Sequence, residues 1–164
     1  MSNRDYDVIV VGGGPAGSAT AIGCATAGKK VLLVEKGSRE RDKPCGGVLP
    51  LVAPDTIEDI VGESIPDEAR ADPTELGLYY VPPSGRENSG RVKNYSIHNI
   101  DRGPFDQWLR DLAEDSGVIV KHDSQCIDVT KTDQYKVIVD AKGGKSIVRA
   151  DYIVGADGVR STVR

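Results

Sequence analysis

Tyr6-Asp-Val-Ile-Val-Val-Gly-Gly-Gly-Pro-Ala-Gly17 is the stretch that decides the fold of this 164-residue chain. Its apolar run, residues 8–11, predicts a buried parallel strand, and the Ala-rich pattern over about 15–27 predicts a helix. Between them, Gly12, Gly14 and Gly17 have the spacing G-x-G-x-x-G. These glycines permit a tight turn, a close approach to a diphosphate, and packing of the helix on the strand. Strand, glycine turn and helix in this order predict a dinucleotide-binding unit, with the diphosphate at the helix N-terminus.

A second apolar run supports this prediction. Val31–Val34 predicts another buried strand, and Glu35 follows it directly. A carboxylate at that strand end can accept hydrogen bonds from ribose hydroxyls. The alternative is a solvated carboxylate without a ligand. The acidic strand end makes the glycine pattern much more specific than the glycines alone.

Composition bounds the function classes. With 38% hydrophobic and 28% charged residues, the chain suits one soluble globular domain. Its net charge of −4 and the absence of a basic cluster argue against a nucleic-acid partner. No apolar run reaches the about 20 residues of a membrane span. Cys24, Cys45 and Cys126 form no C-x-x-C pair, so we expect no zinc site and no disulfide framework, as in a reducing cytoplasm.

The remaining elements alternate between helix and strand. We expect helices at 55–61 and 104–116, strands at 76–81, 93–97 and 118–121, and an antiparallel meander of strands at 126–130, 135–139 and 146–149. A last core strand, 152–154, leads into the start of a helix at 159–164. The predicted fold class is α/β, a Rossmann-like domain with a parallel sheet, a β-meander and part of a second sheet. The strand-rich segment at about 48–100 is expected to be an insertion on the substrate side.

A second glycine junction, Gly155-Ala156-Asp157-Gly158, ends the last predicted strand. The carboxylate of Asp157 lies where the strand ends, within reach of an extended cofactor. The flanking glycines allow the cofactor to approach closely. Together with the first glycine turn and Glu35-Lys36, this junction resembles the FAD-dependent enzymes of the glutathione-reductase-like superfamily. The resemblance covers nearly the whole chain. It implies FAD as cofactor, with the second junction near its diphosphate and ribityl part.

The segment Lys43-Pro-Cys-Gly-Gly-Val-Leu-Pro50 narrows the resemblance. It is similar to the Cys-Gly-Gly segment of the geranylgeranyl reductase family, which hydrogenates isoprenoid double bonds. The resemblance implies that Cys45 lies near the flavin ring as a candidate catalytic residue, although a small residue in a glycine loop needs no chemical role. It also implies that Arg102 contacts FAD, unless it only pairs with a neighbouring aspartate. Cys126 falls where the family's backbone meets the adenine end.

The resemblance gives a complete expected site. The expected cofactor-binding residues are Gly12, Gly14, Pro15, Ala16, Gly17, Glu35, Lys36, Cys45, Gly46, Gly47, Arg102, Cys126, Asp157 and Gly158, and no metal ligands are expected. Members of that family continue for well over a hundred further residues, with a third FAD motif and most of the substrate pocket. We therefore expect residues 1–164 to be an incomplete, N-terminal FAD-binding domain that is inactive alone.

The implied activity is reduction of isoprenoid double bonds in lipid biosynthesis by hydride transfer from reduced FAD. NAD(P)H and ferredoxin are the candidate electron donors, and the substrate is an isoprenoid or another apolar small molecule. We expect a cytoplasmic protein, with peripheral membrane association of the full-length form compatible with such a substrate. Two alternatives stay open: an FAD-dependent aromatic monooxygenase, and a nucleotide-binding module without catalysis.

Overall fold

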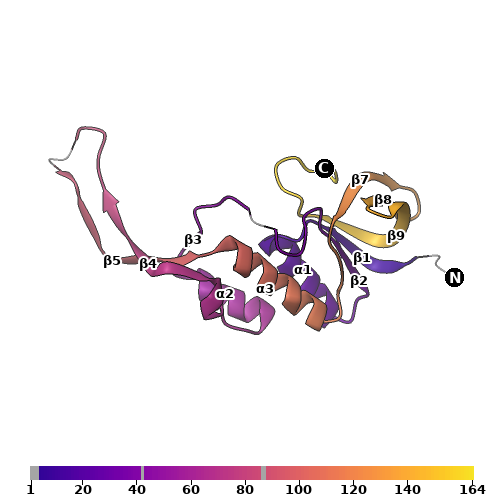
Figure 1. The fold of residues 1–164 in the computed structure, drawn as a ribbon, viewed down its shortest axis with the longest axis horizontal. Helices are drawn as coiled ribbons and strands as arrows, with labels where there is room; N and C mark the ends of the chain where they lie inside the picture. Colours follow the sequence, from indigo (N-terminus) through magenta and orange to yellow (C-terminus); the bar gives the residue numbers. More distant parts are fainter. Residues whose placement is uncertain (1–3, 42, 86–87) are drawn as a thin grey trace. The chain divides into compact units, whose positions relative to one another are not determined.

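The computed structural model describes residues 4–41, 43–85 and 88–164, and it divides into two compact units (Figure 1). Unit 1 comprises the described residues of 1–41 together with 106–164. Unit 2 comprises the described residues of 42–105. Each unit contains its own sheet.

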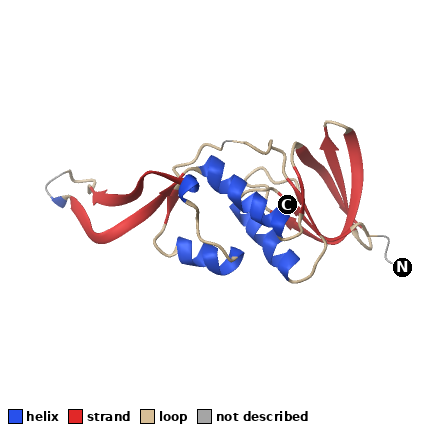
Figure 2. Cartoon of the chain, turned by 60° about the horizontal axis from the view of Figure 1, so that its bottom comes forward, coloured by secondary structure: helices blue, strands red, loops and turns tan. Residues whose placement is uncertain are grey.

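Unit 1 is built on a six-stranded sheet with the strand order β6-β2-β1-β9-β8-β7. Its strands are β1 (Tyr6–Val11), β2 (Val31–Val34), β6 (Ile119–Lys121), β7 (Ser124–Lys131), β8 (Tyr135–Ala141) and β9 (Gly144–Gly155). Neighbouring strands among β6, β2, β1 and β9 are parallel, whereas β9, β8 and β7 pair antiparallel and form a curved ribbon (Figure 2). This mixed sheet, with its helices, confirms the predicted α/β fold class.

The core of unit 1 covers both faces of the central strands. All four residues of β2 and the last four of β1 are buried, as their continuous apolar runs predict. Helix α1 (Pro15–Thr26) contacts β1 and β2. Cys126, Val137 and Val139 of the meander pack in one cluster with Ile9 and Leu32. Helix α3 (Arg102–Asp115) has most of its length in unit 1.

Unit 2 holds a three-stranded antiparallel sheet, β3-β5-β4. Its elements are β3 (Val48–Leu49), α2 (Ala53–Val61), a 3₁₀ turn η1 (Asp67–Ala69), β4 (Arg70–Tyr80) and β5 (Gly90–Ile100). The long hairpin of β4 and β5 is visible in Figure 1, and both strands exceed the predicted 76–81 and 93–97. No helix in the described ranges of either unit is long and apolar enough to cross a membrane. That unit 2 faces a substrate stays a prediction.

The last predicted strands are not separate. The segments 146–149 and 152–154 belong to one strand, β9. Ala150 is where β9 changes partner, because it pairs with Tyr135 of β8 and with Tyr6 of β1. The sequence pattern of one strand does not reveal that its neighbours differ along its length, so the prediction of two strands was wrong.

The predicted helix start at 159–164 was also wrong. The Asp157 carboxylate accepts the N–H of Thr162 at 2.6 Å, and the Ser161 hydroxyl oxygen accepts the N–H groups of Val163 and Arg164, each at 3.2 Å. A helix would direct such N–H groups to carbonyls four residues earlier, and short polar side chains compete for them. The segment therefore forms turns.

Two glycines of α1 test the close packing of the first glycine turn. A Cβ at Gly17 would clash with the carbonyl oxygen of Gly12, whereas a Cβ at Gly23 would meet no atom within 4 Å. We expect Gly17→Ala to lower the free energy of unfolding by about 1–3 kcal/mol. Gly23→Ala should raise it by up to about 1 kcal/mol, because alanine favours the helix. Urea unfolding followed by circular dichroism measures both changes, and equal stability of the two variants would contradict the close approach.

Candidate cofactor site

The first glycine turn brings three backbone segments of unit 1 together. Gly12 donates its N–H to the carbonyl of Val34 at 2.8 Å, and Ala156 donates to the carbonyl of Val11 at 2.8 Å. Gly12 has a φ of 105°, and a Cβ there would clash with the Ala156 carbonyl. The ends of β1, β2 and β9 therefore meet at Gly12. Only glycine fits at this position, because any side chain would clash with the end of β9.

Helix α1 starts at this turn with its N-terminus uncapped. Gly14 is the N-cap and Pro15 occupies the first turn, followed by Ala16. Among the residues that the structure describes, no side chain caps the helix, and its first turn carries no acidic residue. The positive end of the helix dipole is therefore not neutralised from within the helix, which suits an anionic ligand.

Glu35 is buried beside the glycine turn. Its side chain is 2% exposed, so the alternative of a solvated carboxylate is wrong. Oε2 accepts the N–H of Gly13 at 2.6 Å, and Oε1 accepts the N–H of Gly37 at 2.7 Å. Each carboxylate oxygen has two lone pairs, so Oε2 keeps one acceptor position beyond its bond to Gly13. The contact of Glu35 with a ribose hydroxyl stays a prediction.

Arg41 and Asp106 extend the charged cluster around Glu35. The guanidinium of Arg41 lies 3.3 Å from Glu35 Oε1 and 3.2 Å from Asp106 Oδ2. Neither residue belongs to the predicted site. A usable signal was present for Asp106, because it is a polar residue beside the apolar positions Phe105 and Leu109 of a predicted helix.

Arg110 is a further residue that the predicted site does not include. It is fully buried, and its guanidinium donates to the carbonyls of Gly13 at 3.1 Å and Arg39 at 2.8 Å, and to Gln107 at 3.0 Å. Burial lowers its pKa, although an arginine stays charged at any physiological pH. Arg110 thereby fixes the glycine turn to α3.

Asp157 lies in the second glycine junction, before Gly158. Partial burial acts to raise the pKa of Asp157, but hydrogen bonds from the Ser161 hydroxyl and from backbone N–H groups outweigh it, so the pKa lies below its usual value. Its Oδ2 accepts the N–H of Thr162. Its Oδ1 is buried and has no partner among the described residues. An ionised carboxylate with an unpaired buried oxygen is an acceptor available to a ligand.

Two predicted residues of unit 1 differ in their surroundings. Lys36 is exposed next to Glu35. The side chain of Cys126 is 4% exposed and belongs to the apolar core, where burial raises its pKa. Cys126 can therefore meet a cofactor only through its backbone, near Ser124, whose N–H donates to the Glu35 carbonyl at 2.9 Å.

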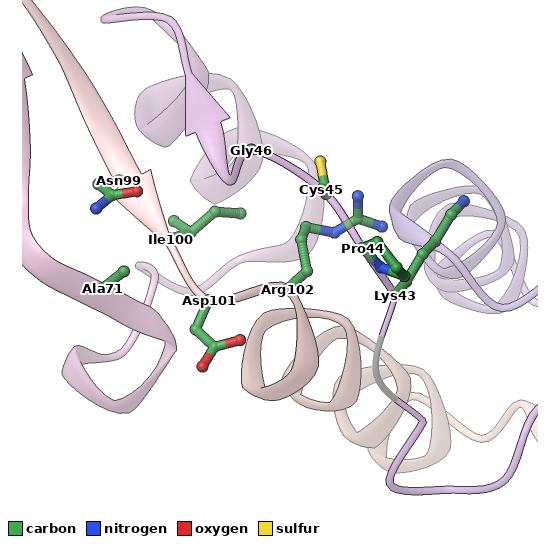
Figure 3. Close-up of a pocket in the computed structure, with 9 residues that line it drawn as sticks. All are labelled: Lys43, Pro44, Cys45, Gly46, Ala71, Asn99, Ile100, Asp101 and Arg102. Atoms are coloured by element: carbon green, nitrogen blue, oxygen red, sulfur yellow. The ribbon is translucent and has the colours of Figure 1, made fainter.

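Unit 2 contains four predicted site residues, Cys45, Gly46, Arg102 and Gly47. A pocket of about 350 Å³ is lined by Lys43, Pro44, Cys45, Gly46, Ala71, Asn99, Ile100, Asp101 and Arg102 (Figure 3). The fourth residue, Gly47, accepts the N–H of Ile100 at 2.8 Å. Figure 3 shows the thiol of Cys45 next to the guanidinium of Arg102. The N–H of Gly47 and then Arg102 lower the pKa of the exposed Cys45 thiol.

The predicted site thus falls into two sets. Unit 1 contains Gly12, Gly14, Pro15, Ala16, Gly17, Glu35, Lys36, Cys126, Asp157 and Gly158, and unit 2 contains Cys45, Gly46, Gly47 and Arg102. The first set surrounds the glycine turn, and the second lines or supports the pocket. Across the described part of the chain, no group of three or more His, Cys, Asp or Glu side chains could hold a metal ion.

The acceptor role of Glu35 predicts a cost of removing its charge. Glu35→Gln places an amide NH₂ against one of the N–H donors of Gly13 and Gly37. We expect the free energy of unfolding to fall by about 1.5–3 kcal/mol, the contribution typical of hydrogen bonds to a charged group. The control Glu40→Gln, at an exposed position, should change it by less than about 0.5 kcal/mol. Urea titration measures the free energy of unfolding of both variants. Equal losses of stability in the two variants would contradict the buried role of Glu35.

The lowered pKa of Cys45 predicts selective thiol reactivity. The thiolate is the nucleophile, so iodoacetamide should modify Cys45 faster than the buried Cys126 at neutral pH. Arg102→Met should move the midpoint of the pH–rate profile of Cys45 to higher pH, because it removes the adjacent positive charge. Peptide-resolved mass spectrometry follows each cysteine separately. An unchanged midpoint would show that Arg102 does not act on the thiol.

Comparison with known proteins gives relatives along nearly the whole chain. Protein CbrA of Escherichia coli (strain K12) is 36% identical over 167 residues, which cover 97% of this chain and 45% of CbrA. The chain thus spans about half the length of the curated relatives it matches. A geranylgeranyl bacteriochlorophyll reductase-like protein of Thermoplasma acidophilum superposes with a TM-score of 0.80 and 28% identity, over 93% of this chain and 39% of that protein. The flavin-dependent brominase Bmp2 superposes with a TM-score of 0.77 and 26% identity, over 94% of this chain and 38% of the brominase.

The family assignment rests on a match to the model of a whole protein family. The model of the FAD binding domain family matches residues 5–164, which include both glycine junctions and Glu35. The match agrees with the geometry, in which the uncapped α1 and the orphaned Asp157 oxygen offer positions for an anionic nucleotide. This chain belongs to the FAD binding domain family, and FAD, as predicted, is its cofactor.

Proposed function

We propose that this chain is the FAD-binding part of an oxidoreductase that reduces the double bonds of geranylgeranyl-type isoprenoids. The observation that carries the proposal is the position of Cys45 and Gly46 beside Arg102 in unit 2, residues that would lie near the flavin ring and not around the isoprenoid chain. These residues are the ones on which the resemblance to geranylgeranyl reductases depends. The likeness to the reductase-like protein of Thermoplasma acidophilum supports the same substrate class.

The residues of unit 1 fit the adenosine diphosphate half of FAD. Glu35 would accept a ribose hydroxyl, and the N-terminus of α1 beside Gly14 would receive the diphosphate. The Asp157 Oδ1 would accept a hydrogen bond from the cofactor, which would satisfy its unpaired oxygen. The side chains that bind the nucleotide would thus be held by contacts within unit 1.

When bound in its reduced form, FAD would supply the hydride for one carbon of a double bond, and a proton from solvent would complete the other carbon. NAD(P)H or ferredoxin would return the two electrons. An isolated alkene is a poor hydride acceptor, so positioning in a dry pocket must contribute much of the rate. The pocket at Cys45 is lined by Lys43, Asp101 and Arg102 and suits a polar ligand rather than an isoprenoid chain. An isoprenoid chain needs an apolar tunnel. We therefore propose that this tunnel is formed by segments that the longer relatives have beyond this match.

A second candidate is an oxygen-dependent hydroxylase or halogenase. The likeness to the flavin-dependent brominase favours it, because that protein shares the fold over a similar part of its length. The two candidates differ in their electron acceptor, which is an alkene in the first and molecular oxygen in the second.

For the first candidate, we propose a cytoplasmic protein that associates peripherally with a membrane, where an isoprenoid substrate would be found.

The electron acceptor is the property to test. A protein that contains this chain at the length of its relatives is loaded with FAD, reduced with dithionite and kept free of oxygen. On addition of geranylgeraniol, we expect the flavin to be reoxidised and the product to gain two hydrogen atoms per reduced double bond. The matched variant Cys45→Ser should slow this step more than it weakens FAD binding.

The alternatives give different results in the same experiment. Flavin that stays reduced with the alkene, but is reoxidised by oxygen with oxygenation or halogenation of an aromatic compound, would favour the second candidate. Absence of both reactions in a protein that binds FAD would favour a nucleotide-binding module. Residues 1–164 alone should show neither reaction.

A further inference from the structure

Arg41 is held in place by two buried carboxylates. Its Nη1 pairs with Glu35 Oε1 at 3.3 Å and its Nη2 with Asp106 Oδ2 at 3.2 Å. The side chains of Glu35 and Asp106 are 2% and 1% exposed, whereas that of Arg41 is 17% exposed. Rotation of the guanidinium away from this position would remove a positive charge from beside two buried carboxylates, which is costly. Arg41 is therefore the partly exposed end of a rigid charged cluster.

The charges of this cluster bear on an anion at the glycine turn. Glu35 and Asp106 contribute two negative charges, and Arg41 and the buried Arg110 contribute two positive ones. Glu35 lies directly beside the turn, where its charge alone would repel a diphosphate. The positive charge of Arg41 opposes that repulsion, and Arg41 is more exposed than Arg110.

The guanidinium of Arg41 also has donors to spare. It carries five N–H groups, and its Nε has no hydrogen-bond partner among the described residues. Its Nη2 lies 3.6 Å from the position that a Cβ on Gly14 would occupy, at the N-cap of α1. The Nη2 end of the guanidinium, which carries two N–H groups and uses one on Asp106, therefore lies near the helix N-terminus where a diphosphate is expected.

We propose that Arg41 binds the diphosphate of FAD directly, and that Asp106 positions Arg41 for this contact. The proposal rests on the placement of FAD given under the proposed function, and it adds a residue that the glycine motifs do not include. In the competing explanation, Arg41 only stabilises Glu35 and touches no ligand. The two explanations differ in which part of the nucleotide feels the loss of Arg41.

The test compares ADP with adenosine as probes of residues 1–164, by isothermal titration calorimetry. Both probes carry the ribose that Glu35 would bind, and only ADP carries the diphosphate. We expect Arg41→Met to weaken ADP binding about tenfold or more, as the loss of a charge-assisted hydrogen bond implies, and adenosine binding less than about twofold. Arg41→Lys, which keeps the charge, should restore part of the ADP affinity. Asp106→Asn should also lower the affinity for ADP relative to that for adenosine, because its neutral side chain holds Arg41 less firmly.

The matched control is Arg39→Met. Arg39 lies in the same loop, but its side chain is half exposed and pairs with Asp111 and Glu114. This variant should bind both probes as the unchanged chain does. The salt dependence of ADP binding is a second readout, because it should be weaker in Arg41→Met than in Arg39→Met.

The outcomes separate the inference from the proposed function. Unchanged ADP binding in Arg41→Met, or equal losses for ADP and adenosine in an Arg41→Met variant that circular dichroism shows to be folded, would overturn the contact of Arg41 with the diphosphate and leave the cofactor placement intact. A partly unfolded variant would lose affinity for both probes equally, and Arg41→Lys then decides whether the charge matters for ADP alone. If the unchanged chain bound FAD but neither ADP nor adenosine, the placement of the cofactor on unit 1 would fail as well.

Discussion

The buried carboxylate of Glu35 connects segments of unit 1 that are far apart in the sequence. It accepts the N–H of Gly13 in the first glycine turn and that of Gly37 after β2, and through Arg41 it reaches Asp106 of α3. Gly13 and Asp106 are buried and Arg41 is only 17% exposed, so loss of the carboxylate would leave poorly solvated partners and lower the stability of unit 1. A ribose hydroxyl that binds Glu35 would meet an acceptor whose position is already fixed, which reduces the entropy lost on binding.

Local sequence patterns predicted the parts of the fold that depend on near neighbours. The bounds of β2, Val31–Val34, followed from an apolar run between Lys30 and Glu35. Arg110 could not be placed in the same way, because its burial depends on carbonyl acceptors at Gly13 and Arg39 that only the folded chain brings near. The glycine turn and its acidic strand end were visible as a motif. Arg41 was recognisable only as one of two cations, with Lys43, in an otherwise solvated charged loop that could lie near phosphates, because the sequence does not reveal its contacts with Glu35 and Asp106.

The fold of this chain is shared by flavin-dependent proteins that carry out different reactions. A reductase-like protein and a brominase both superpose on this chain, so the arrangement of strands around the glycine turn is compatible with more than one flavin chemistry. The residues that distinguish these chemistries must lie near the reacting end of the cofactor. Of the described residues, Cys45 with Arg102 is the pair that we connect with that end, and this connection came from a resemblance rather than from spacing or periodicity.

The partner exchange along β9 has a consequence for synthesis on the ribosome. The central strand β1 is made first, yet its neighbour on one side is the stretch of β9 from Ala150 onward. At roughly 5–20 residues per second, β1 waits for about 7–30 s before that stretch emerges. Until then one edge of β1 has no strand to pair with, and such an edge can pair with another chain. Unit 1 therefore cannot complete its sheet until the end of β9 has left the ribosome, and newly made chains depend on dilution or on chaperones to remain separate during that interval.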